Sequence, residues 1–270
     1  AGTTLTALMQ GRLTAHAIDP VAQHGSDVLF GGAGDDQLYG AGGDDRLYGE
    51  DGIDTVYGGV GNDVIDGGAG TDTLVGDDPT GAQGVDEIHG GADADSVFGM
   101  GGDDALYGDA GNDTLAGGAG GTQTGSGNDR LYGGDGDDSL FGQDGNDTLT
   151  GDAGHDTLDG GDGNDTFYAD SGNDVLFGGT GDDTFVLSRG AGQVQITDAA
   201  GSNVLTFGTG VTANDISVVR QNGLVYIDYS ATDSAFMDAA TYAQLTSIQF
   251  ADGATWTPNV EPSAPRPSSP

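Results

Sequence analysis

Aspartates that recur at a fixed spacing are the residues of this chain best suited to chemistry. From Gly31 to Val186 the sequence repeats a nine-residue pattern sixteen times, and the sixth residue of every unit is an aspartate. Like charges that a regular fold places close together repel one another unless a cation lies between them. Carboxylate and backbone carbonyl oxygens are the ligands that calcium prefers, whereas magnesium demands a tighter octahedral geometry. The pattern therefore predicts a series of calcium sites.

We expect the metal ligands to be these sixth-position aspartates, together with the equivalent aspartate of a partial unit at residues 25–30. A single aspartate in a glycine-rich turn usually accepts a local hydrogen bond or is solvated. That interpretation does not explain sixteen aspartates in phase. The predicted ligands are Asp27, Asp36, Asp45, Asp54, Asp63, Asp72, Asp86, Asp95, Asp104, Asp113, Asp129, Asp138, Asp147, Asp156, Asp165, Asp174 and Asp183.

The rest of each unit predicts the elements that hold these aspartates. The first six residues are rich in glycine, which tolerates positive φ and is typical of a tight turn. The last three alternate between polar and apolar residues, which indicates a short strand with one buried side. The eighth residue is apolar in every unit and should form the core. The expected core residues are Leu38, Leu47, Val56, Ile65, Leu74, Ile88, Val97, Leu106, Leu115, Leu131, Leu140, Leu149, Leu158, Phe167, Leu176 and Phe185.

Two units of nine residues make one coil of 18, with one strand in each of two facing sheets. Coils should stack at about 4.8 Å, the spacing between neighbouring strands. The sequence thus predicts an all-β fold, a right-handed parallel β-roll. Turns two units apart lie on the same edge of the roll, so their aspartates come one strand spacing apart. If each pair of stacked turns holds one ion, roughly a dozen calcium ions are bound.

Several irregularities interrupt the pattern. The units at 76–89 and 117–132 carry about five and about seven extra residues, and we expect both inserts to be surface loops on the same edge. Asp93 replaces a fourth-position glycine and Ala169 a first-position glycine, so altered or missing sites are expected there. The ninth residue is often aromatic. We interpret these aromatics as cross-strand ladders that cover a sheet face, in preference to a binding surface.

The chain is strongly acidic, with 44 Asp and Glu residues against 6 Lys and Arg and a formal net charge of −38. This charge argues against nucleic acids and anionic membranes as direct partners, because both would repel it. There is no cysteine, so neither disulfides nor zinc–thiolate sites stabilise the chain. Neither an HExxH nor a GxSxG motif occurs, and the four histidines are scattered. We therefore expect that the chain is not an enzyme.

The flanks differ from the repeats at 25–186. Residues 1–24 are expected to be an N-terminal flank or a front cap, and residues 258–270 a Pro/Ser linker. Residues 187–257 contain strand patterns separated by Gly and Asn turns, and they should form a small β cap on the open end of the roll. Neither a signal peptide nor a transmembrane run is predicted. We expect a monomeric module of a longer chain.

The repeats GGAGDDQLY, GAGGDDRLY and GEDGIDTVY resemble the calcium-binding nonapeptides of the RTX (repeat-in-toxin) family, and the resemblance covers residues 31–186. The stretches GDDTFVLSRGAGQVQITD and LTSIQFADGATWT resemble the region that follows the repeats in haemolysin-type calcium-binding proteins. The resemblance implies a secreted or cell-surface location. It also implies that the type I secretion machinery is a partner, because that channel passes unfolded chains.

Three functions are compatible with these features. The first is a calcium-triggered folding and secretion module of a large exported toxin or adhesin, which we favour. The second is a calcium-rigidified structural or adhesive rod of a surface protein. The third is the accessory calcium-binding tail of a secreted enzyme whose catalytic residues lie outside this chain. The sequence does not separate these parent proteins.

Overall fold

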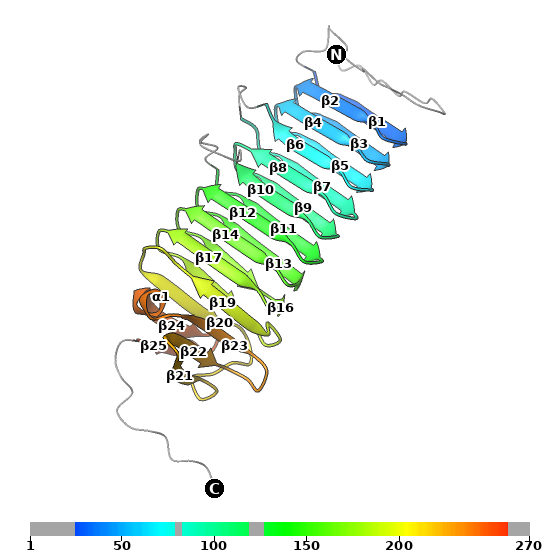
Figure 1. Ribbon diagram of the computed structural model, residues 1–270. Helices are drawn as coiled ribbons and strands as arrows, with labels where there is room; N and C mark the ends of the chain where they lie inside the picture. Colours follow the sequence, from blue (N-terminus) through cyan, green and yellow to red (C-terminus); the bar gives the residue numbers. More distant parts are fainter. Residues whose placement is uncertain (1–24, 79–82, 119–126, 259–270) are drawn as a thin grey trace.

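The computed structural model describes residues 25–78, 83–118 and 127–258, which form a parallel β-roll (Figure 1). The predicted N-terminal flank and almost all of the predicted linker lie outside these residues. The chain passes alternately through two sheets, so each sheet contains every second strand of the repeats. Within the roll, neighbouring strands of a sheet are parallel and come from successive coils. The predicted parallel β-roll is confirmed.

The first sheet begins with β1 and carries the odd-numbered strands of the regular coils. Its strands are β1 (Val28–Ala33), β3 (Arg46–Asp51), β5 (Val64–Ala69), β7 (Glu87–Ala92), β9 (Ala105–Ala110), β11 (Arg130–Asp135), β13 (Thr148–Gly154), β15 (Thr166–Ala169), β16 (Ser171–Gly172), β18 (Thr184–Leu187), β20 (Asn203–Phe207), β24 (Leu245–Phe250) and β25 (Thr255–Trp256).

The second sheet faces the first across the core. Its strands are β2 (Gln37–Gly42), β4 (Thr55–Val60), β6 (Thr73–Asp77), β8 (Ser96–Met100), β10 (Thr114–Gly118), β12 (Ser139–Asp144), β14 (Thr157–Asp162), β17 (Val175–Thr180), β19 (Gln193–Thr197), β21 (Ser217–Gln221), β22 (Leu224–Asp228) and β23 (Ser234–Asp238).

The strands are longer than the repeat pattern suggested. We expected strands of three residues, but a typical strand such as β2 has six and continues through the first glycines of the next unit. That expectation was wrong because the glycine-rich residues remain in the parallel ladder, where Gly42 pairs with Val60 of the next coil. The turn proper is therefore short, and it contains the fourth to sixth residues of each unit.

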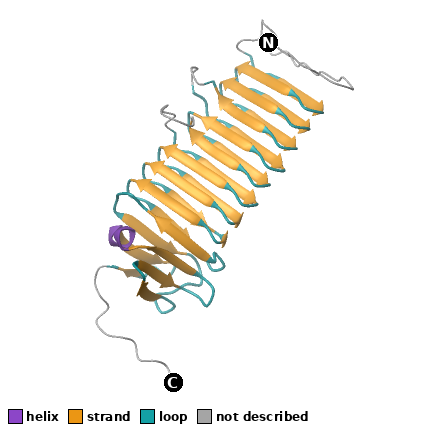
Figure 2. Cartoon of the chain, in the orientation of Figure 1, coloured by secondary structure: helices purple, strands orange, loops and turns teal. Residues whose placement is uncertain are grey.

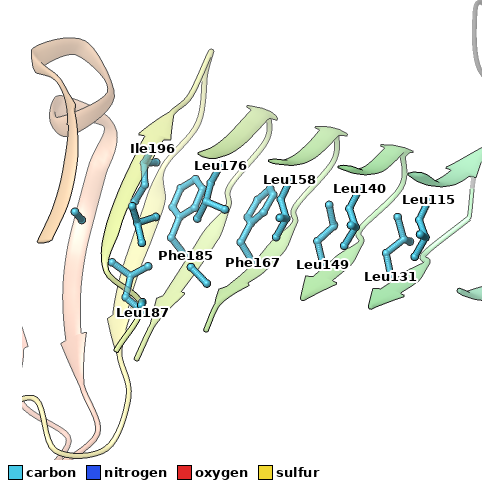
Figure 3. Close-up of a cluster of buried hydrophobic side chains, with 14 of the residues drawn as sticks. Leu115, Leu131, Leu140, Leu149, Leu158, Phe167, Leu176, Phe185, Leu187 and Ile196 are labelled. Atoms are coloured by element: carbon cyan, nitrogen blue, oxygen red, sulfur yellow. The ribbon is translucent and has the colours of Figure 1, made fainter. Parts of the chain in front are cut away.

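The eighth-position residues form one continuous core between the sheets, as predicted. Figure 3 shows part of this column, in which side chains from the two sheets meet along the axis of the roll. From Leu47 to Phe185 each of these side chains is fully buried, and Leu38 is 6% exposed. Parallel register keeps the column in phase, with Leu47 opposite Ile65 in one sheet and Val56 opposite Leu74 in the other. The core is thus only one side chain deep in each sheet.

A substitution in this column tests how much the narrow core contributes. Leu131→Ala, in the middle of the roll, should cost about 2–5 kcal/mol, because few neighbours can move to fill the cavity. Leu29→Ala is the matched control, since Leu29 has the same place in the first coil but is only partly buried. Thermal unfolding in saturating calcium would measure both. Equal losses of stability in the two variants would contradict a continuous core.

Ninth-position aromatic rings stack on the outer faces of the sheets. Tyr39 and Tyr57 have ring centroids 5.1 Å apart, and those of Tyr107 and Tyr132 are 4.9 Å apart. The ring of His89 extends the second stack, 4.4 Å from Tyr107. These contacts confirm the cross-strand ladders. Because each ring covers the face of the next, the stacks present mainly ring edges to solvent.

The two inserts lie on one edge of the roll, as expected. They occur in the connections from β6 to β7 and from β10 to β11, both of which run from the second sheet to the first (Figure 1). Equivalent aspartates of successive coils are normally 18 residues apart, but they are 23 apart across the first insert and 25 apart across the second. Residues 79–82 and 119–126 of the inserts lie outside the described residues.

The segment after the repeats extends both sheets. Strands β20 and β24 continue the first sheet in parallel, and β19 and β23 continue the second. Antiparallel strands then end each sheet, β25 in the first and β22 and β21 in the second. The helix α1 (Ala239–Gln244) begins at Asp238, whose side chain accepts a hydrogen bond from the Thr241 N–H (Figure 2). Among the described residues, no helix could span a membrane.

Candidate metal centre

The sixth-position aspartates form two rows, one along each edge of the roll. We call the edge with the inserts the insert edge, and its row contains Asp27, Asp45, Asp63, Asp86, Asp104, Asp129, Asp147, Asp165 and Asp183. The row of the opposite edge contains Asp36, Asp54, Asp72, Asp95, Asp113, Asp138, Asp156 and Asp174. Asp36 is 6% exposed and the others from Asp45 to Asp183 are at most 2% exposed. Asp27, in the partial first unit, is only partly buried.

From Asp45 onward, one oxygen of each carboxylate joins its coil to the coil before it. On the insert edge, the backbone N–H of Asp45 donates to Oδ1 of Asp63 at 2.8 Å. On the opposite edge, the N–H of Asp36 donates to Oδ1 of Asp54, also at 2.8 Å. The same bond recurs along both rows, and the N–H of Asp183 ends its row by donating to Oδ1 of Asn203. An aspartate is suited to this position because its short side chain reaches the preceding turn.

The other carboxylate oxygen, Oδ2, is the one that points to a metal. In most of these aspartates Oδ2 is buried and has no hydrogen-bond partner. This holds for Asp45, Asp54, Asp63, Asp72, Asp86, Asp95, Asp104, Asp113, Asp138, Asp147, Asp156, Asp165 and Asp183. Burying an ionised oxygen without a partner is costly, so native proteins almost always provide a donor or a cation. A buried Oδ2 atom without a partner, repeated from coil to coil, fits a row of cation sites.

Glycine at the first position leaves room for these oxygens. A Cβ on Gly67 would lie 2.6 Å from Oδ2 of Asp72 and 2.5 Å from the carbonyl oxygen of Gly90 in the next coil. Any side chain here would therefore displace the carboxylate or the carbonyl. Ala169 carries a methyl group at this position. Asp174 in the same unit still accepts the regular bond from Asp156 through Oδ1, at 3.1 Å, but the methyl group occupies space that lies beside Oδ2 in the regular units.

Backbone carbonyl oxygens complete the set of candidate calcium ligands. The carbonyl oxygens at the second and fourth positions face the next coil, as Glu50 and Gly52 face Gly68 and Gly70. Asp93, which replaces a fourth-position glycine, keeps the turn with a φ of 76°. In the described part of the chain, no three His, Cys, Asp or Glu side chains converge on one point. The candidate ligands are therefore carboxylate oxygens and carbonyl oxygens of the turns, and such an all-oxygen set suits calcium.

Burial raises the pKa of the sixth-position aspartates. It is the largest cause at Asp86 and Asp104, whose pKa rises to about 8, and at Asp45, whose pKa rises to about 7. The N–H donated to each carboxylate lowers the pKa, and neighbouring aspartates of the row raise it again. Without a cation the negative charges therefore oppose this packing at neutral pH.

A second ladder, which the sequence analysis missed, lies just outside the first. Fifth-position side chains accept a hydrogen bond from the fifth-position N–H of the next coil, as Asn128 accepts from Asn146 at 2.9 Å. His155 takes part through Nδ1, which accepts from the N–H of Asn173 at 2.9 Å. The frequent Asp or Asn at the fifth position was the signal in the sequence. These side chains are exposed, and they hold the turns in register.

Two further buried carboxylates were also missed. Asp198 accepts from Asn203 through Oδ2 at 2.8 Å, while its Oδ1 is buried without a partner. Burial raises the pKa of Asp183 to about 7, and the facing carboxylate of Asp198 adds to this rise. Asp77, at the start of the first insert, is 2% exposed. Neither residue occupies the sixth position of a unit, so the period could not identify them.

A comparison with protein families agrees with this geometry. The RTX calcium-binding nonapeptide repeat family matches residues 25–56, 48–78, 80–115, 123–158, 150–185 and 159–194. A comparison with curated proteins found no match. Among solved structures, the chain is similar to the extracellular lipase LipA from Serratia marcescens, at 19% sequence identity and a TM-score of 0.26. That similarity covers 79% of this chain but only 38% of the lipase chain. The family matches span most of the roll, and the chain belongs to the RTX calcium-binding nonapeptide repeat family.

Proposed function

We propose that this chain is a calcium-binding RTX module of a large exported protein, either a toxin or an adhesin. In this proposal the module is disordered at low calcium and folds cooperatively in extracellular calcium. The observation that carries the proposal is the row of buried Oδ2 atoms without a partner on each edge of the roll. The roll buries these charges in a regular pattern, and its own side chains supply no cation to balance them.

The residues of the chain oppose folding when no cation is bound. A net charge of −38 repels itself, and the 54 glycines lose much conformational entropy when the coils form. The core that offsets these costs is a single column of side chains in each sheet. Such a composition favours disorder in the absence of a binding partner.

The residues that would hold the ions are the buried sixth-position aspartates, with carbonyl oxygens of the adjoining turns. Calcium would supply positive charge and hard-oxygen coordination at these turns, and its binding free energy would add to the stability of the fold. Extracellular calcium modules typically bind at about 10⁻⁴–10⁻³ M. We propose roughly a dozen ions per chain, one between each pair of stacked turns.

The proposed change from a disordered chain at low calcium to a folded roll at high calcium also suits export. Type I secretion machinery is the proposed partner, because an unfolded chain can pass a channel and can fold after it emerges. Family membership supports this proposal, as does the lack of cysteine, since the module requires no disulfide to fold. The proposed location is therefore secreted or at the cell surface. We also propose that catalysis, if the parent protein has any, resides outside this chain.

A calcium titration of the chelated protein tests the proposal. We expect an expanded chain with little β structure in chelator and a steep transition to a compact, β-rich form at about 10⁻⁴–10⁻³ M calcium. Circular dichroism and small-angle scattering would follow the transition, with magnesium at the same concentrations as the control. Magnesium should substitute poorly because it retains its water ligands. A chain that is already compact and β-rich in chelator would overturn the proposal.

A further inference from the structure

We propose that Asp77 adds a second carboxylate to the calcium site at Asp86, so that this site binds more tightly than the regular sites and fills first. The inference rests on the proposed calcium binding and concerns Asp77, a buried residue at the start of the first insert. Among the described residues, Asp77 is the one second-position carboxylate that is almost fully buried, at 2% exposed.

The backbone of the insert turns Asp77 towards the interior. Asp77 is the second residue of its unit, a position that has positive φ in most regular units. Glu50 and Asp109 are examples, with φ values of 78° and 69°, and both are exposed. Asp77 does not share this conformation, and its side chain is 2% exposed.

The ladder between coils opens at this point and makes room for the carboxylate. Strands β4 and β6 remain paired as far as Gly59 and Asp77, but the pairing of β6 with β8 ends earlier, at Val75 and Phe98. In regular turns the fourth-position N–H donates to a carbonyl of the next coil, as Gly52 does to Ala69. The equivalent N–H of the insert unit, on Gly84, donates instead to Oδ2 of Asp77 at 2.7 Å.

The second oxygen of Asp77 is left for a ligand. Its Oδ1 is buried and has no hydrogen-bond partner, as does Oδ2 of Asp86. Both carboxylates lie beside Gly84, because its N–H donates to Asp77 and a Cβ on it would lie 3.1 Å from Oδ1 of Asp86. Two buried carboxylates with free oxygens therefore lie at one turn. A hard cation gains affinity as the number of charged ligands rises, and calcium sites in proteins are tuned in this way.

The second insert provides a comparison within the same chain. It follows Gly118, which stands where the first insert has Asp77 and has no side chain to offer. Its fourth-position residue, Gly127, keeps the regular bond to the carbonyl of Asp144 in the next coil, at 3.3 Å. An insert alone therefore does not create the arrangement. The ladder opens at both inserts, since the pairing of β10 with β12 also ends early, at Ala116 and Phe141. The carboxylate of Asp77 and its bond from Gly84 are what distinguish the first insert.

The test compares Asp77→Asn with Asp78→Asn in the whole chain. Both variants remove one negative charge from the same insert, but Asp78 is exposed. Asparagine at position 77 can still accept from the Gly84 N–H, so the fold in saturating calcium should match that of the wild type by circular dichroism. Calcium retained per chain would be measured by equilibrium dialysis against buffers of fixed free calcium, with the folding midpoint measured in parallel.

We expect Asp77→Asn to lose the ion that the wild type retains at the lowest free calcium, so that this ion requires roughly tenfold more free calcium, while the midpoint of folding, which depends on all the ions, rises only slightly. Asp78→Asn should titrate like the wild type. The inference is overturned if the two variants titrate alike, or if Asp77→Asn shifts to lower calcium, which would show that charge repulsion outweighs ligation. A wild type that binds no calcium would instead contradict the proposed function, so the two failures are distinguishable.

Discussion

Gly136→Ala is expected to prevent the central coils from folding at calcium concentrations that fold the wild type. Gly136 is a fourth-position glycine with a φ of 146°, and a Cβ on it would overlap the carbonyl oxygen of Gly111 in the preceding coil. Neither residue can move far, because both belong to backbone turns that are bonded to the coils on each side. Circular dichroism during a calcium titration would measure the effect.

Gly34→Ala is the matched control for this substitution. Gly34 has the same fourth position and a φ of 109°, but it lies in the first coil and a Cβ there would meet no described atom within 4 Å. The control should therefore show only the strain of positive φ, about 1–2 kcal/mol. Similar midpoints for the two variants would mean that the coils do not stack as closely as the structure shows.

In chelator, the chain is expected to become compact when the pH is lowered from about 8 to about 4. Burial raises the pKa of many row aspartates from an ordinary 3.8 to about 6, 7 or 8, as at Asp63, Asp45 and Asp104. The folded state therefore binds protons more tightly than the unfolded state. Its stability is greatest below about pH 4 and is lost as the pH rises through the raised pKa values.

Small-angle scattering would measure this change as a fall in the radius of gyration. An unfolded chain of 270 residues has a radius of gyration of roughly 55–60 Å, and the roll should have less than about half of that value. High salt at pH 8 is the control, because it screens exposed charges without supplying a proton to the buried oxygens. An equal compaction in salt, or none in acid, would contradict the role assigned to the buried carboxylates.

The repeat in the sequence predicted the main features of the roll. A period of nine with an apolar eighth residue places Leu47, Ile65 and their equivalents in one column, because parallel register preserves phase. The sixth-position aspartates were placed at the turns by the same argument, and burial of their carboxylates agrees with a binding role. These features follow from local pattern alone, since each coil contacts only its neighbours.

Features that depend on a break in the period were not predictable. Asp77 turns inward only because the insert changes its backbone, and Asp198 meets Asp183 only after the chain has left the repeats. The strand β23 and the helix α1 were missed because no repeat sets their limits, and the helix is stabilised by a cap at Asp238. The length of the strands was underestimated because glycine is disfavoured in strands in general. In this chain glycine suits the strands because its missing side chain leaves space for the carboxylate and carbonyl oxygens of the turns.

The hydrogen bonds of the aspartate rows give the roll a polarity. From Asp27 to Asp165, each sixth-position N–H donates to a carboxylate that belongs to the coil after it, so each of these coils is completed by its C-terminal neighbour. The two ends are therefore chemically unlike. Among the described residues, the carboxylates of Asp27 and Asp36 in the first coil accept no N–H from an earlier turn, while the row of Asp183 ends at Asn203, which accepts from Asp183 and carries no charge.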